Sequence, residues 1–186
     1  EALPQMDMIK KSGFDVLMFT DEIDEFMVNI LQKYDDIEFK SVSQGDLDLL
    51  DEEQKEVHDK LSKESKSLLK AIKKALNEQV EDVILSKRLT DSPVCLVSGE
   101  GLSMEMEKVL KAMPQSNNMK ANKILEINPN HELFAMLQKV YDNDKKKVKE
   151  YATLLYNQAL LIEGMKLENP VEFSNLMVSL MIDANK

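Results

Sequence analysis

The chain has 186 residues, 43% hydrophobic and 31% charged, which is enough for one domain or for one domain with part of another. Its net charge is −10 and Arg88 is its only arginine, so the composition argues against a nucleic-acid-binding protein. The single cysteine, Cys95, excludes an intrachain disulfide and fits a reducing compartment, and no apolar run is long enough to predict a membrane span. Twelve methionines with no tryptophan are the unusual feature, because methionine fills both cores and adaptable binding surfaces.

The start of the chain predicts a small strand–helix–strand unit. An apolar run at 14–19 has the length of a strand, and residues 38–43 are a second strand candidate. Between them, apolar residues recur at helical spacing over 22–33, behind an acidic first turn that suits a helix N-terminus. The composition shifts near residues 44–50, where we predict a domain boundary. The two predicted domains are residues 1–45 and 46–186.

The second domain is predicted to be α+β, with a small sheet between helices. A long amphipathic helix is expected at about 51–77, with one apolar stripe and one solvated face. Strands are predicted at 80–85, 94–98 and 123–127, and further helices at about 129–141, 145–163 and 170–183. The pairs Asn128-Pro129 and Asn169-Pro170 each predict a helix start, because a capping residue precedes a proline at the first helical position.

The last two predicted helices carry more apolar surface than one chain can cover. The stretch 151–165 has one charged residue and two apolar seams, and the stretch 173–182 has no charge at all. Exposing several such side chains would cost several kcal/mol at about 25 cal/mol per Å². We therefore predict a homodimer joined by an intermolecular four-helix bundle; packing of both helices on the chain's own sheet is the alternative. The predicted interface residues are Leu154, Leu155, Leu161, Ile162, Phe173, Leu176, Met177, Leu180 and Met181.

Another apolar face lies on the segment 101–113, between a pair of glycines and a polar loop. Its apolar residues fall on one side of a three-turn helix. They are Leu102, Met106, Val109, Leu110 and Met113. This face can pack on the sheet as ordinary core, or it can be a mobile, methionine-rich surface that binds apolar segments of other proteins. The composition alone does not decide between these interpretations.

Catalytic and metal-binding patterns are weak in this chain. His58 is expected to be solvated within a charged helix, and helix capping accounts for His131. Cys95 lies in an apolar strand, where buried thiols are usually inert. No glycine-rich phosphate motif occurs, and residues 46–57 match a calcium loop poorly. We predict no enzyme activity, no metal and no cofactor in this chain; the competing hypothesis is a small hydrolase or transferase that uses Cys95 with a histidine.

Four stretches of the sequence resemble the C-terminal region of the ninety-kilodalton heat-shock chaperone family, in its bacterial form. They include, in order, GFDVLMFTDEIDEF, LSKRLTDSPVCLVSGEG, ILEINPNHELF and LLYNQALLIEGMKLENP, and the resemblance extends from about Gly13 to Met181. It implies an ATP-driven, homodimeric chaperone of the cytoplasm that serves the stress response and protein folding. The ATP and Mg site would lie in an N-terminal domain outside this chain. Residues up to about 45 would end a middle domain, and the rest would form the dimerisation domain.

The resemblance also implies contacts with unfolded client proteins. The segment 101–113 is similar to an exposed amphipathic helix of the family, which carries client contact to the apolar face described above. The helix of the first unit adds Glu25, Phe26 and Asn29. An indole ring is common at the position of Phe26, so the apolar surface is kept while the indole hydrogen bond is lost. The alternative is a purely structural dimerisation domain without a client surface.

The two ends of the chain carry a further expectation. The chain begins at Glu1 without a methionine or a signal peptide, so we expect a piece of a longer protein. It ends at Lys186 without the acidic pentapeptide tail of cytosolic eukaryotic members. A bacterial protein without helper partners of the helical-repeat class is therefore expected.

Overall fold

A three-stranded sheet stands at the centre of the structure, which is a computed structural model that describes residues 3–21, 23–47, 49–113 and 119–184. Its strands are β3 (Asp82–Leu85), β4 (Val94–Ser98) and β5 (Lys123–Ile127), in the order β3-β5-β4. The middle strand β5 runs parallel to β3 and antiparallel to β4, and Leu125 lies opposite both Val83 and Leu96. All five residues of β4 are buried, as its apolar composition predicts.

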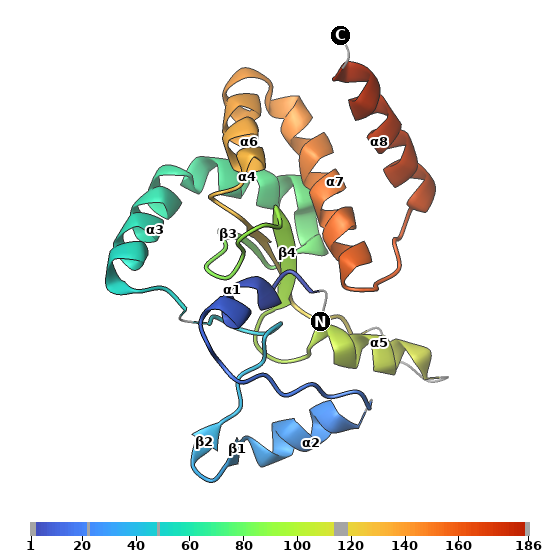
Figure 1. Cartoon of the computed structure of the whole chain (residues 1–186). Coiled ribbons are helices and arrows are strands. Elements are labelled where there is room, and N and C mark those ends of the chain that lie inside the picture. Colours follow the sequence, from blue (N-terminus) through green and yellow to red (C-terminus); the bar gives the residue numbers. More distant parts are fainter. Residues whose placement is uncertain (1–2, 22, 48, 114–118, 185–186) are drawn as a thin grey trace.

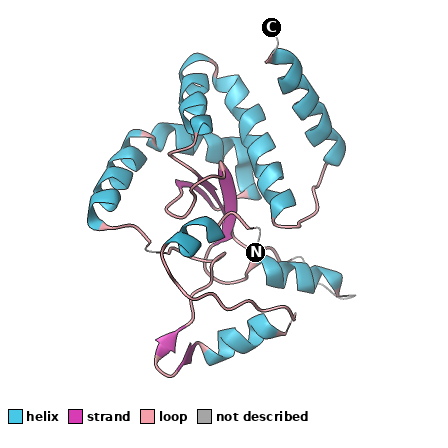
Figure 2. Cartoon of the chain, in the orientation of Figure 1, coloured by secondary structure: helices cyan, strands magenta, loops and turns pink. Residues whose placement is uncertain are grey.

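Helices α4 (Lys66–Leu76), α6 (Glu132–Asn143) and α7 (Lys145–Ile162) pack around this sheet (Figure 1). They bury their apolar faces with alternate strand residues in one large core. A second, smaller cluster of Leu89, Cys95 and Val97 holds the alternate side chains of β4, since successive residues of a strand point to opposite faces. The last helix, α8 (Pro170–Asp183), returns beside α7, and the α+β class is confirmed (Figure 2).

The predicted single helix at 51–77 is wrong, because two helices meet there. Helix α3 (Glu52–Glu64) is capped by Asp51 and Gln54 in a reciprocal capping box, and α4 begins directly after Ser65. A short 3-10 turn, η1 (Asn77–Gln79), follows α4. The break lets α4 pack on the sheet while α3 buries none of its residues, all of which the structure describes. A continuous apolar stripe therefore predicted both helices but not the bend between them.

The first 41 residues form fewer strands than predicted. They contain α1 (Met6–Lys11), α2 (Asp24–Leu31) and a two-residue hairpin of β1 (Lys33–Tyr34) and β2 (Ile37–Glu38). The predicted strand at 14–19 does not form, and that at 38–43 shrinks to the edge of this hairpin. A strand needs a neighbour for its backbone hydrogen bonds, and residues 14–19 meet no such neighbour in the chain that the structure describes. None of the described residues from 10 to 41 is buried.

The segment 42–45 joins this unit to the sheet through Arg88. The guanidinium of Arg88 donates hydrogen bonds to the carbonyl oxygens of Val42 (2.9 Å) and Gly45 (2.6 Å), and it pairs with Glu126 at 3.1 Å. The backbone of Ser98 also exchanges hydrogen bonds of 2.9 Å with this segment. The single arginine of the chain is thus a buried structural residue.

The two predicted asparagine–proline caps have different outcomes. At Asn169 the cap is confirmed, because its Oδ1 accepts a hydrogen bond from the backbone N–H of Glu172 at 3.1 Å. The Asn128 cap is wrong: α6 begins three residues later, where Nδ1 of His131 accepts from Leu133 N–H at 3.1 Å. Asn128 is buried and donates instead to the carbonyls of Thr90 and Ser92, both at 3.0 Å. Asn128 thus connects the start of the loop before α6 to the loop at 90–92, and this contact could not be predicted because its partners lie 36 and 38 residues away.

Candidate functional site

Helix α5 (Met104–Ala112) projects from the sheet region and packs through an unexpected face. Ser103 caps it, since its Oγ accepts a hydrogen bond from the N–H of Met106 at 3.0 Å. The side chains that point inward are Met104 and Glu107, which are 2% and 1% exposed. They lie three residues apart, which places them on one face of the helix. The packed face of α5 is therefore short and partly charged.

The apolar face of α5 lies on the other side and keeps contact with solvent. Leu102, Met106, Val109 and Leu110 are half-buried, and Met113 is 49% exposed. These five residues are not part of the buried core clusters. The interpretation of this face as ordinary core is thus not supported, and a surface available for binding fits the observed burial better.

Glu107 binds the segment that leads into β5. Its Oε2 accepts hydrogen bonds from Lys123 Nζ (2.5 Å) and from the backbone N–H of Ala121 (2.8 Å), and its Oε1 accepts from Lys111 Nζ (2.5 Å). Burial by itself raises the pKa of Glu107, but these hydrogen bonds from Lys111, Lys123 and Ala121 outweigh it and hold the pKa below its ordinary value. A charged carboxylate therefore anchors α5 to the sheet.

The two groups of residues assigned to client contact are brought together by the fold. The amide of Asn29 on α2 donates to the sulfur of Met106 on α5 at 3.7 Å, although 77 residues separate them. Glu25 and Phe26 on the same helix are half-buried. Both helices lie on the side of the molecule opposite the end of α8 (Figure 1). We call this area the α2–α5 surface; it comprises Glu25, Phe26, Asn29, Leu102, Met106, Val109, Leu110 and Met113.

The first unit exposes more apolar side chains than the sequence interpretation assigned to it. The apolar run at 14–19 was the sequence signal for this region, and it was interpreted only as a strand. Ile30 on α2 is 85% exposed. The other exposed apolar residues of this unit are Phe14, Leu17, Met18, Phe19, Ile23, Met27, Leu31, Tyr34 and Ile37.

Helices α7 and α8 form an antiparallel pair with very different burial. Helix α7 buries six residues, whereas α8 buries none of its fourteen, all of them described. Among the residues predicted for the dimer interface, Leu155 is only 3% exposed and belongs to the chain's own core, so that assignment is wrong. The other eight are exposed or half-buried: Leu154, Leu161, Ile162, Phe173, Leu176, Met177, Leu180 and Met181.

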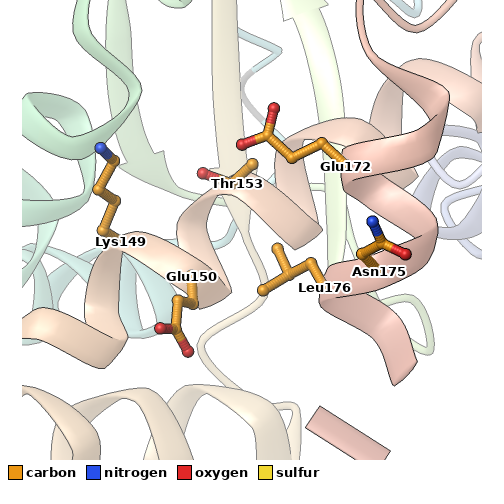
Figure 3. A pocket seen from close by; sticks show the side chains of 6 residues that line it. All are labelled: Lys149, Glu150, Thr153, Glu172, Asn175 and Leu176. Atoms are coloured by element: carbon orange, nitrogen blue, oxygen red, sulfur yellow. The ribbon is translucent and has the colours of Figure 1, made fainter. Parts of the chain in front are cut away.

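A groove of about 330 Å³ runs between these two helices (Figure 3). Lys149, Glu150 and Thr153 of α7 and Glu172, Asn175 and Leu176 of α8 line it. Farther along the pair, Lys147 Nζ at the start of α7 pairs with the carboxylate of Asp183 at the end of α8, at 3.2 Å. The lining is mixed polar and apolar, with charged side chains from both helices beside Leu176.

The residues considered for catalysis have structural roles. Cys95 is buried in β4, and burial, assisted by the negative charge of Glu126, raises the pKa of its thiol well above the ordinary value. Such a thiol is a poor nucleophile. The prediction that His58 is solvated is wrong: its ring packs against the sheet, with Nε2 3.1 Å from the carbonyl oxygen of Leu85. His131 caps α6, and no group of three or more potential metal ligands occurs within the described ranges.

Comparison with known proteins identifies the class. The profile of the Hsp90 protein family matches residues 1–185, so the chain belongs to the Hsp90 family. It is 49% identical over 183 residues to the chaperone protein HtpG of Bacillus subtilis (strain 168) and 50% identical over 181 residues to that of Clostridium botulinum (strain Okra / Type B1). These matches cover 98% and 97% of the chain but only 29% of each relative. Among the residues that the structure describes, none of the helices combines the length and the hydropathy of a membrane span.

Proposed function

We propose that the chain is the C-terminal region of an HtpG-like chaperone, in which residues 1–45 end a middle domain and residues 46–186 form the dimerisation domain. The burial supports this division in part, because the large core lies wholly within the second segment, whereas Gln5, Met6 and Ile9 of the first segment are also buried. The chain joins its partner copy through α7 and α8 and binds unfolded client proteins on the α2–α5 surface. ATP and Mg act in the part of the protein outside this chain, which is itself not an enzyme.

The unburied apolar face of α8 carries the dimer proposal. Val171, Met177, Val178, Met181 and Ile182 are exposed on one helix, and soluble monomers rarely leave such patches uncovered. A twofold axis would place α7 and α8 of each copy in one four-helix bundle and cover this patch. The net charge of −10 and the buried free thiol of Cys95 support a cytoplasmic protein without nucleic-acid partners.

Sedimentation of two matched variants tests the dimer. The unmodified chain is expected at twice 21.3 kDa, and the variant with Met177→Glu and Met181→Glu at 21.3 kDa with unchanged helix content, because two charges would have to be buried in the bundle. Val57→Glu is the control, since it adds a charge at an exposed apolar position on α3. A concentration-independent monomer of the unmodified chain at micromolar protein would overturn the proposal.

The client proposal depends on the exposure of the α5 apolar face, and three substitutions test it. Replacing Leu102, Met106 and Leu110 by serine is expected to preserve the fold and to weaken suppression of the aggregation of a denatured test protein. Val57→Ser serves as the control. If each serine instead reduced the free energy of unfolding by about 2–5 kcal/mol, as core truncation does, the face would be core. If the fold and the aggregation assay were both unchanged, the chain would be a purely structural dimerisation domain.

A further inference from the structure

Helix α5 leaves Met106, Val109 and Leu110 partly exposed to solvent while it buries the carboxylate of Glu107, although carboxylates are usually the more exposed group. The side chains of Glu107 and Lys123 are 1% and 6% exposed, and their charged atoms lie 2.5 Å apart. Lys123 begins β5, and Ala121, which donates its backbone N–H to the same carboxylate, lies two residues before it. One side chain of α5 thus holds two groups at the entrance of the central strand.

A charged anchor constrains a helix in a way that apolar packing does not. Apolar contacts are non-directional, so a helix that rests on them can rotate about its axis and still bury similar area. Hydrogen bonds to the two oxygens of a carboxylate require defined distances and angles. Rotation of α5 that buried its apolar face would separate Glu107 from Lys123 and leave a buried charge unpaired, which is strongly unfavourable.

We propose that Glu107 is the positioning residue of the α2–α5 surface: its buried ion pair with Lys123 sets the rotation of α5, so that Met106, Val109 and their neighbours face outward. This inference rests on the proposed client binding for its biological purpose. The orientation itself can be measured without any client. Among the residues of α5, all of which the structure describes, Met104 is the only other one that is buried. Its backbone N–H donates a hydrogen bond to Ser98 Oγ at 2.9 Å, which holds the start of the helix at β4, but a single flexible methionine side chain defines the rotation of the helix poorly.

The neighbouring pair on the same helix provides a matched comparison. Glu105 also binds a lysine, Lys108, at 2.5 Å, but their side chains are 58% and 31% exposed, and both lie on α5. Such a pair contributes little and cannot connect the helix to the sheet. Lys111, the third partner of Glu107, is half-exposed and also belongs to α5. The pair of Glu107 with Lys123 is therefore the connection that fixes α5 relative to β5.

The main test replaces the ion pair by apolar residues and reports the orientation through a thiol. A cysteine introduced at Val109 reports whether the apolar face is outward, since the natural Cys95 is buried. In the unmodified background this thiol is expected to react quickly with a maleimide. Glu107→Leu with Lys123→Met removes both charges together, a change that is often neutral for stability. We expect the reaction to slow about tenfold, the result if the outward orientation falls to roughly a tenth of the population.

Glu105→Gln is the control and is expected to leave the reaction rate unchanged. An unchanged rate in the double variant would overturn the proposal. If the double variant does not fold, Glu107→Gln is used, and hydrogen exchange is expected to show faster exchange in α5 with unchanged protection in β4 and β5. Unfolding of both variants would also overturn it, because Glu107 would then hold the core rather than the position of one helix.

The client assay separates this inference from the proposed function. If the thiol slows but aggregation suppression is unaffected, Glu107 positions α5 and the client proposal fails. If the serine variants lose suppression while the thiol rate stays constant in the double variant, clients bind α5 and Glu107 does not position it. Loss of both the fast thiol reaction and the suppression in the double variant supports the two proposals together.

Discussion

Helices α7 and α8 are neighbours that both carry apolar residues, and α8 is the more apolar of the two, yet the burial of their apolar residues differs sharply. Helix α7 places Val148, Ala152, Leu155 and three further residues in the core, whereas α8 buries none of its residues over its full, described length. The same contrast separates the sheet region from the unit at 10–41, where no described residue is buried. Apolar residues near the sheet therefore stabilise this chain itself, and those of α8 and the first unit are available to surfaces outside it.

Among the substitutions considered, replacement of Arg88 is expected to lower the stability of the sheet region most, because it removes several buried contacts at once. Arg88→Met removes the ion-pair partner of the buried Glu126 side chain, and it removes the hydrogen bonds that Arg88 donates to the carbonyl oxygens of Val42 and Gly45. We expect a loss of about 3–5 kcal/mol in the free energy of unfolding, measured by urea denaturation. Lys87→Met is the control, because Lys87 pairs with Asp46 at the surface and should change stability by about 1 kcal/mol or less. If the two substitutions reduced the free energy of unfolding equally, the contrast between buried contacts of the sheet region and contacts at the surface would be contradicted.

Truncation of a single apolar side chain in each region gives a more direct comparison. Leu125 is completely buried between its two neighbouring strands, so Leu125→Ala is expected to cost about 2–5 kcal/mol through lost contacts and a cavity. Ile30→Ala removes a similar side chain from α2, where it is exposed, and should change stability by about 0.5 kcal/mol or less. The measurement is the same urea titration. A large cost for Ile30→Ala would mean that α2 is packed in solution.

The smallest expected effect is a pH dependence of stability caused by Glu163, the residue that follows α7. Burial raises the pKa of Glu163, and the hydrogen bond that Gln5 Nε2 donates to it at 2.5 Å and the charge of Lys108 offset this only in part. The folded chain therefore holds this proton more tightly than the unfolded chain, so Glu163 destabilises the fold at neutral pH and does so less as the pH falls through its raised pKa. Glu163→Gln should be more stable than the unmodified chain at neutral pH, with an advantage that shrinks on acidification.

Thermal unfolding across the acidic to neutral range measures this difference. Glu168→Gln is the matched control, since Glu168 is exposed and only 3.8 Å from Lys120 at the surface. Its effect on stability should be small throughout that range. A stability difference between Glu163→Gln and the unmodified chain that stays constant with pH would show that Glu163 keeps its ordinary titration in the folded state.

Local patterns predicted most elements of the fold. The three strands of the sheet and the bounds of α8 agree with prediction. A run of consecutive apolar residues is enough to predict a buried strand, and a local capping motif is enough to predict where a helix begins. The strand at 14–19 failed because strand formation depends on a partner, which no run of six residues can specify. His58 was misjudged for a related reason: its charged neighbours in the sequence predicted solvent, and the carbonyl of Leu85, 27 residues away, decided otherwise.

The sequence by itself determined the order of the elements, the buried strands and the excess of apolar residues in the last helix, since these follow from composition and period. It also identified the apolar face of α5, with Met106 and Leu110. Only the tertiary structure decided which face of α5 turns inward, and it selected the side with Glu107. Burial of a carboxylate depends on partners that arrive from elsewhere in the chain, in this case Lys123 and the backbone of Ala121, 16 and 14 residues away.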